Sequence, residues 1–184
     1  MSENQISSTE HAVGVASLVL LASSIARKAH ADQFRRDGVT PYITHPEAVA
    51  ESLTGEHPDV IAAAWLHDVL EDTEVTTAEL KGAGIPWQVM DAVLLLTRGK
   101  GQPYEDYLRW ITQDEIALKV KIADIRHNLS DAPTEKQVAK YEIALGLLAN
   151  VQAIHGGVGS PNLKRDVTRR WMSRLVLRIF LARV

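Results

Sequence analysis

Helix signals run through nearly the whole chain, whereas patterns typical of strands are almost absent. No alternating apolar and polar run is bounded by hairpin turns. The chain also lacks a GxxxxGK[ST] loop and a GxGxxG motif after a strand, which disfavours P-loop and Rossmann nucleotide sites. The sequence therefore predicts an all-α fold, a compact multi-helix bundle.

Caps, prolines and glycines divide the chain into expected helices. Thr44 is expected to cap a short helix, and Thr76 with Glu79 forms a capping-box pattern. Loops are expected over residues 32–44 and 98–103, each punctuated by glycine and proline. The predicted helices span residues 11–31, 46–53, 59–71, 76–82, 86–97, 104–111, 114–129 and 133–155.

A glycine-rich turn at residues 156–161 marks the one expected boundary. Residues 1–155 are expected to form the main domain, and residues 156–184 the turn with a basic amphipathic helix. Residues 160–184 hold seven basic residues and one acidic residue, whereas residues 1–159 hold 13 basic and 22 acidic residues. We expect the last helix to pack on the same domain or to join two copies in a homo-oligomer. The alternative is binding to an anionic membrane or nucleic acid.

Composition excludes several classes of function. With no cysteine, the chain has no disulfide scaffold, thiolate metal site or cysteine nucleophile. Its formal net charge of -3 lacks the basic footprint of nucleic-acid binders, so no nucleic-acid partner is expected. The uncharged stretch over residues 12–25 is too short to span a bilayer, and no basic residue precedes it as in a signal peptide. We therefore expect a cytoplasmic protein without a membrane partner.

Four ionisable residues end an apolar helical segment, in the order His67, Asp68, Glu71 and Asp72. Residues 60–66 before them are apolar, so placing these groups at a buried helix end is costly unless they are paired or bind a cation. The i, i+4 spacing puts His67 near Glu71, and Asp68 near Asp72. An imidazole beside a carboxylate suits a metal ion, and further carboxylates remain for acid–base chemistry.

Two other segments carry residues of the same kind. Lys121, Asp124 and Asn128 share one face of a largely apolar helix, and His45 lies at a loop-to-helix junction. Taken singly, each of these residues is explained as a core, cap or surface residue. Together, His45, His67, Asp68 and Asp124 supply two imidazoles and two carboxylates, which suit Mn²⁺ or Fe²⁺ as well as Zn²⁺.

That order, H…HD…D, resembles the signature of the HD superfamily of metal-dependent phosphohydrolases. The blocks at residues 29–46, 64–73 and 121–129 are similar to the hydrolase domain of RelA/SpoT homologues. The resemblance spans roughly residues 26–130 and is to the single-domain small alarmone hydrolases of the Mesh type.

The resemblance implies an HD-domain bundle, one bound Mn²⁺ and a role for each residue of the motifs. His45, His67, Asp68 and Asp124 would bind the metal. Glu71 and Asp72 would handle the attacking water. Arg35, Arg36, Lys121 and Asn128 would contact the nucleotide. The implied reaction removes the 3′-pyrophosphate from (p)ppGpp, giving GDP or GTP and pyrophosphate.

Departures from the family pattern bear on base selection more than on metal binding. Asp37 stands where a small polar residue is usual, Ile125 replaces an arginine, and Asp131 stands where a threonine often helps to hold guanine. Two alternatives therefore stay open. One is an HD phosphohydrolase for another nucleotide, such as NADPH or a deoxynucleotide. The other is a non-catalytic helical module that binds a nucleotide.

Overall fold

The computed structural model describes the backbone of residues 17–157 and the side chains of residues 17–151. This part of the chain is helical, which confirms the all-α prediction. The only extended pairing within it is an isolated antiparallel bridge between Phe34 and Pro41. A first helix over residues 17–29 leads into the loop that carries this bridge. The later helices are α2 (Thr44–Ser52), α3 (Pro58–Leu66), α4 (Val69–Asp72), α5 (Thr77–Gly82), α6 (Trp87–Leu96), α7 (Tyr104–Ile111), α8 (Glu115–Ser130) and α9 (Glu135–Gly157).

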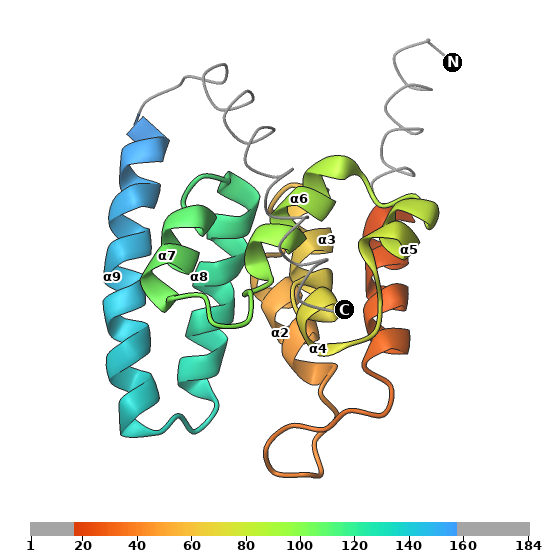
Figure 1. Ribbon diagram of the computed structural model, residues 1–184, viewed down its shortest axis with the longest axis horizontal. Coiled ribbons are helices and arrows are strands. Elements are labelled where there is room, and N and C mark those ends of the chain that lie inside the picture. Colours follow the sequence, from red (N-terminus) through yellow and green to blue (C-terminus); the bar gives the residue numbers. More distant parts are fainter. Residues whose placement is uncertain (1–16, 158–184) are drawn as a thin grey trace.

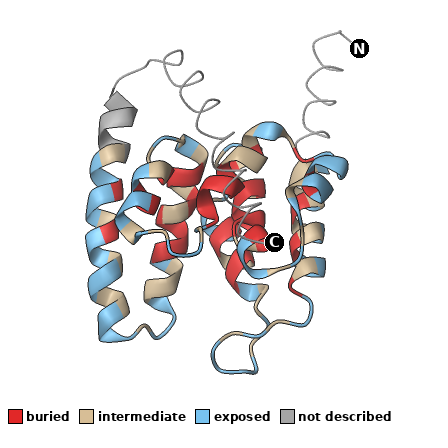
Figure 2. Cartoon of the chain, in the orientation of Figure 1, coloured by how far each residue is buried: buried red, intermediate tan, exposed pale blue. Residues whose placement is uncertain are grey.

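Helix α3 forms the centre of the bundle and packs against α2, α6 and α8 (Figure 1). Apart from Asp59 its sequence is apolar all round, as expected for a helix with neighbours on most sides. Its buried residues join those of α6 and α8 in one core, whereas α9 and α5 expose most of their surface at opposite ends of the molecule (Figure 2). This arrangement brings the inner faces of α2, α3 and α8 together.

Local signals place several helix ends as predicted. Thr76 and Glu79 form the expected capping box at the start of α5. The side chain of Asp114 accepts a hydrogen bond from the Ala117 N–H at the start of α8. Thr44, predicted as a cap, is instead the first residue of α2, and its hydroxyl donates to the carbonyl oxygen of Pro41.

The helix predicted over residues 59–71 is wrong in one respect, because the chain leaves the helix at His67 and Asp68 and resumes in α4. Neighbouring residues in an unbroken helix point about 100° apart around the axis. The two-residue turn instead lets the side chains of His67 and Asp68 approach each other at 3.1 Å. The interruption therefore aims two consecutive side chains at one centre.

The described residues include only part of the predicted C-terminal region. Helix α9 continues through Gly156 and Gly157, where the glycine-rich turn was expected to begin. The remainder of that turn and the basic helix lie outside the described residues, so the proposed division at residue 155 stays a prediction. Within the part of the chain that the structure covers, no helix is long and apolar enough to cross a membrane.

Candidate active site

Four side chains from three parts of the fold converge on one point. His45 comes from the first turn of α2, His67 and Asp68 from the turn after α3, and Asp124 from the middle of α8. The Nε2 atom of His45 lies 3.3 Å from Nε2 of His67 and 3.1 Å from Oδ1 of Asp124. The Nε2 atom of His67 lies 3.1 Å from Oδ2 of Asp68 and 3.9 Å from Oδ1 of Asp124. The structure thus brings together all four residues predicted as metal ligands.

The spacing and chemistry of these atoms fit one transition-metal ion. Candidate ligand atoms of His45, His67 and Asp68 all lie within 4.8 Å of one another, and Asp124 Oδ1 lies 3.1 Å from His45 Nε2. His45, His67 and Asp124 are almost fully buried, and only Asp68 keeps a modest exposure of 19%. Two imidazole nitrogens and two carboxylate oxygens make a donor set suited to first-row divalent ions.

Electrostatics also favour a cation at this point. Burial lowers the pKa of His67, but the carboxylates of Asp68 and Asp124 outweigh burial and raise that pKa to about 9. Burial raises the pKa of Asp68, yet His67 holds it well below its ordinary range. For Asp124, Lys121 and the two histidines overcome burial in the same way. Because a proton on His67 balances the carboxylates, a bound metal can displace that proton.

Each candidate ligand is held by a second contact. The Nδ1 atom of His67 lies 2.7 Å from the carbonyl oxygen of Ala64. The Nδ1 atom of His45 lies 2.8 Å from Nδ1 of His127. These contacts fix each imidazole so that its Nε2 faces the centre.

The carboxylate of Asp124 is held by two residues of its own helix. Lys121 Nζ donates to Oδ2 at 2.7 Å, and Asn128 Nδ2 donates to Oδ1 at 2.5 Å. Both residues were predicted to contact substrate, and the structure places both against the carboxylate of Asp124, a candidate ligand. Their observed contacts position Asp124.

The two carboxylates predicted to handle water point to different neighbours. Glu71 Oε2 accepts a hydrogen bond of 2.8 Å from the backbone N–H of Arg98. Asp72 Oδ2 lies 3.1 Å from the hydroxyl of Tyr42, which donates to Asp68 Oδ2 at 2.6 Å. Burial raises the pKa of both Glu71 and Asp72, and the charge of Asp68 raises both further. Raised pKa values suit groups that exchange a proton.

Arg35 and Arg36 reach from the loop before α2 toward the ends of α8 and α9. Arg35 pairs with Asp131 and lies over the ring of Tyr42, with its Cζ atom 5.7 Å from the ring centroid. Arg36 donates to the side chain of Gln137 at 3.0 Å. The arginines thus lie on the side of the centre where the loop meets α8 and α9.

The departure at Asp37 has a structural role in this loop. Its carboxylate accepts hydrogen bonds from the backbone N–H groups of Val39 and Thr40 and from the Thr40 hydroxyl. These bonds lower the pKa of Asp37 to about 2. Gly38 adopts the left-handed backbone conformation that this turn requires. The Asp37 carboxylate therefore stabilises this turn.

Sequence reasoning did not assign roles to two residues that contact the centre, Tyr42 and His127. Tyr42 lies in the Pro-Tyr-Ile-Thr-His block, three residues before His45, and His127 lies directly before Asn128. Both therefore stood inside recognised motifs. Their partners lie 26 and 82 residues away along the chain, so only the fold reveals the contacts.

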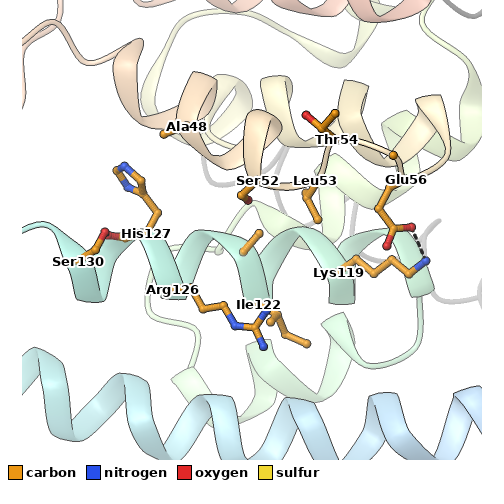
Figure 3. A pocket seen from close by; sticks show the side chains of 12 residues that line it. Ala48, Ser52, Leu53, Thr54, Glu56, Lys119, Ile122, Arg126, His127 and Ser130 are labelled. Atoms are coloured by element: carbon orange, nitrogen blue, oxygen red, sulfur yellow. Dashed lines mark hydrogen bonds and ion pairs between the residues drawn. The ribbon is translucent and has the colours of Figure 1, made fainter.

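A separate groove of about 660 Å³ lies between the end of α2 and one side of α8 (Figure 3). The ion pair of Glu56 and Lys119 stands at one end, and His127 at the other. None of the four candidate ligands lines it. His127, which contacts His45, is the lining residue that links the groove to the centre.

Comparisons with known proteins agree with this geometry. Residues 22–94 match the HD domain family. The chain is 41% identical to the guanosine-3′,5′-bis(diphosphate) 3′-pyrophosphohydrolase of Haemophilus influenzae, over 78% of this chain and 23% of that protein. It is 33% identical to the bifunctional (p)ppGpp synthase/hydrolase SpoT of Escherichia coli, over 78% of this chain and 22% of that protein. The chain thus spans about a fifth of the length of the curated relatives it matches.

A solved structure has the same fold. It is described as a metazoan ortholog of SpoT that hydrolyses ppGpp and plays a role in starvation responses. The match has a TM-score of 0.62 and 24% sequence identity, and it covers 84% of this chain and 95% of the other. Residues 22–94, which carry His45, His67 and Asp68, thus match the HD domain family.

Proposed function

We propose that the protein is a metal-dependent phosphohydrolase that removes the 3′-pyrophosphate from (p)ppGpp. The convergence of His45, His67, Asp68 and Asp124 on one point carries this proposal. Glu71 and Asp72 follow the ligands by one helical turn, so proton-accepting groups adjoin the candidate metal. Relatives named as hydrolases of this substrate supply the substrate class.

The metal we propose is Mn²⁺, held by the two imidazole Nε2 atoms and one oxygen each of Asp68 and Asp124. An ion of this kind polarises a phosphate oxygen and lowers the pKa of a water molecule bound to it. The buried imidazoles and the hydrogen-bonded carboxylates keep the donor atoms in place without rearrangement.

Glu71 and Asp72 are the proposed proton carriers. In the reaction, the oxygen of water joins phosphorus, and the bond from phosphorus to the ribose 3′-oxygen breaks. The released 3′-oxygen takes a proton, while the water gives one up. A carboxylate whose pKa is raised by burial can accept the proton that water gives up near neutral pH. It can then supply the proton that the 3′-oxygen takes.

Cations near the centre support an anionic substrate. The chain as a whole is acidic, so the groups that attract a polyphosphate must be local. Arg35 and Arg36 lie on the loop beside Tyr42, and an arginine there can fork onto a phosphate or stack on a base. We propose both as nucleotide-binding residues, with Asn128 and Lys121 acting on the substrate through Asp124.

The test is pyrophosphate release from ppGpp by protein stripped of metal and then reloaded. We expect no release after chelation, recovery with Mn²⁺, and loss of both metal binding and turnover in Asp68→Ala. A parallel panel of NADPH, deoxynucleotides and simple nucleotides tests the substrate assignment. Turnover of another nucleotide with none of ppGpp would reject the substrate but keep the metal site. Tight ppGpp binding without turnover would favour a binding module.

The predicted homo-oligomer, the expected absence of nucleic-acid and membrane partners, and the cytoplasmic location remain predictions. Size-exclusion chromatography with light scattering addresses the first of them.

A further inference from the structure

Gln33, in the loop after the first helix, forms hydrogen bonds with three separate parts of the chain. Its Nε2 atom donates to the backbone carbonyl oxygen of Asp72, the last residue of α4, at 2.6 Å. Its Oε1 atom lies 2.7 Å from Nδ1 of His30. Its backbone carbonyl oxygen accepts a hydrogen bond of 2.8 Å from the N–H of Tyr42. One residue thus joins the end of the first helix, the loop before α2 and the end of α4.

These contacts allow the Gln33 amide only one orientation. Because the amide nitrogen donates to a carbonyl oxygen, Oε1 faces His30 and accepts there, so the Nδ1 atom of His30 carries a proton. The ring of His30 is only 1% exposed, and its centroid lies 4.9 Å from that of Tyr42. A buried ring, itself packed against Tyr42, therefore holds the donor that points to Asp72.

The end of α4 needs a partner from outside the helix. The helix has only four residues, and Thr73 after it is extended. The last carbonyl groups of a helix have no intrahelical hydrogen bond, and so short a helix is weakly held by its own bonds. Gln33 supplies the missing donor to Asp72. The same bond restrains the backbone that carries the Asp72 carboxylate, whose Oδ2 lies 3.1 Å from the hydroxyl of Tyr42.

From these contacts we propose that Gln33 is a positioning residue, which holds the Asp72 carboxylate against the Tyr42 hydroxyl beside the candidate metal. This inference rests on the proposed function, because it takes Asp72 as a proton carrier. Among the described residues, Gln33 forms no hydrogen bond with any of the four candidate ligands. Its loss should therefore reduce turnover while metal binding and substrate binding persist.

Steady-state kinetics of Mn²⁺-loaded protein with ppGpp test this role. Gln33→Met keeps the length of the side chain and removes both of its hydrogen bonds. Gln33→Glu keeps the acceptor for His30 but places an oxygen against the carbonyl oxygen of Asp72. We expect each variant to lower kcat about tenfold, since a displacement of about 1 Å can cost roughly 10²-fold and a smaller one less. Both KM and Mn²⁺ affinity should stay unchanged.

A double-mutant cycle separates positioning from a general loss of structure. In an Asp72→Asn background, Gln33→Met should cause no further fall in kcat, because a residue that acts through Asp72 has no carboxylate left to position. Equal falls in the two backgrounds would overturn the proposal, as would an unchanged kcat in Gln33→Met. A loss of Mn²⁺ affinity as large as the loss of kcat would overturn it too.

Hydrogen exchange tests the contact without turnover. By mass spectrometry, amides in residues 69–73 should exchange about fivefold faster in Gln33→Met and Gln33→Glu, the effect of losing one hydrogen bond. Gln88→Met, which changes another half-buried glutamine at the start of α6, is the control and should alter neither exchange nor kcat. Unchanged exchange in both Gln33 variants would overturn the positioning role. If the wild type releases no pyrophosphate from ppGpp but exchange still rises, the proposed function fails and the restraint on Asp72 stands.

Discussion

His127 contacts the Nδ1 atom of His45, the ring nitrogen that faces away from the candidate metal, with 2.8 Å between the two Nδ1 atoms. Only one of two facing nitrogens can carry the proton of this hydrogen bond. If His45 uses Nε2 to bind a metal, its own Nδ1 carries the proton and donates it. His127 must then be neutral and accept at Nδ1, and burial lowers the pKa of His127 in keeping with a neutral ring.

We therefore expect His127 to set the metal affinity of the site. His127→Ala removes the acceptor and should weaken Mn²⁺ binding about 10–100-fold, the usual effect of losing such a partner. His127→Gln keeps a side-chain acceptor and should recover part of the affinity. Competition with a metal-binding dye measures both. Arg126→Gln, on the same turn of α8, is the control, and equal affinity in the wild type and His127→Ala would contradict the role.

Much of this site was predictable from the sequence, because spacing within a helix fixes which residues are neighbours. Lys121, Asp124 and Asn128 were expected on one face, and the structure shows hydrogen bonds from the first and last to the second. The pattern could not tell whether these side chains turn to Asp124 or to a substrate, since both directions satisfy the same spacing. The break at His67 was missed because an apolar helical pattern runs through it and no glycine or proline marks it.

Contacts between distant parts of the chain could not be predicted from the sequence for another reason. Tyr42 and Asp68, or His45 and His127, meet only because α2, α3 and α8 pack together. A single sequence with no strand or hairpin register gives no measure of how its helices cross. The sequence therefore predicted the four side chains that converge, and the fold supplied the residues that hold them.

The buried pair of Lys121 and Asp124 should make the site sensitive to loss of either partner. Asp124→Ala leaves a buried ammonium group without its carboxylate, and we expect a loss of about 3–5 kcal/mol in the free energy of unfolding. The double variant Lys121→Met with Asp124→Leu should regain much of that stability while binding no metal. Urea denaturation of metal-free protein measures both. If Asp124→Ala is as stable as the wild type, the pair of Lys121 and Asp124 is solvated.

Tyr42 is expected to matter for turnover more than for metal binding. Its hydroxyl bridges Asp68 and Asp72, which links a candidate ligand to a candidate proton carrier. Tyr42→Phe keeps the ring that packs beside His30 and removes only this bridge. We expect kcat to fall by about 10–100-fold, less than the roughly 10²–10⁴-fold typical of a group that transfers the proton itself, with little change in Mn²⁺ affinity. If metal affinity falls as far as kcat, Tyr42 acts through Asp68 alone.

Asp91 on α6 should make the protein less stable as the pH rises through the weakly acidic range. Burial, together with the nearby charge of Asp114, raises the pKa of Asp91 to about 6. Its folded-state pKa thus exceeds the ordinary value of 3.8, so between pH 4 and 6 the folded protein holds a proton that the unfolded chain has lost. The free energy of unfolding falls over that interval and stays lower above it.

Since the side chain is partly solvated, we expect Asp91→Asn to raise the free energy of unfolding by about 1 kcal/mol at pH 7 and to leave it unchanged at pH 4. Thermal denaturation of metal-free protein at both pH values measures the gain. Asp32→Asn, which removes an exposed carboxyl group, is the control, and a gain from Asp91→Asn that is the same at pH 4 and pH 7 would assign the effect to packing.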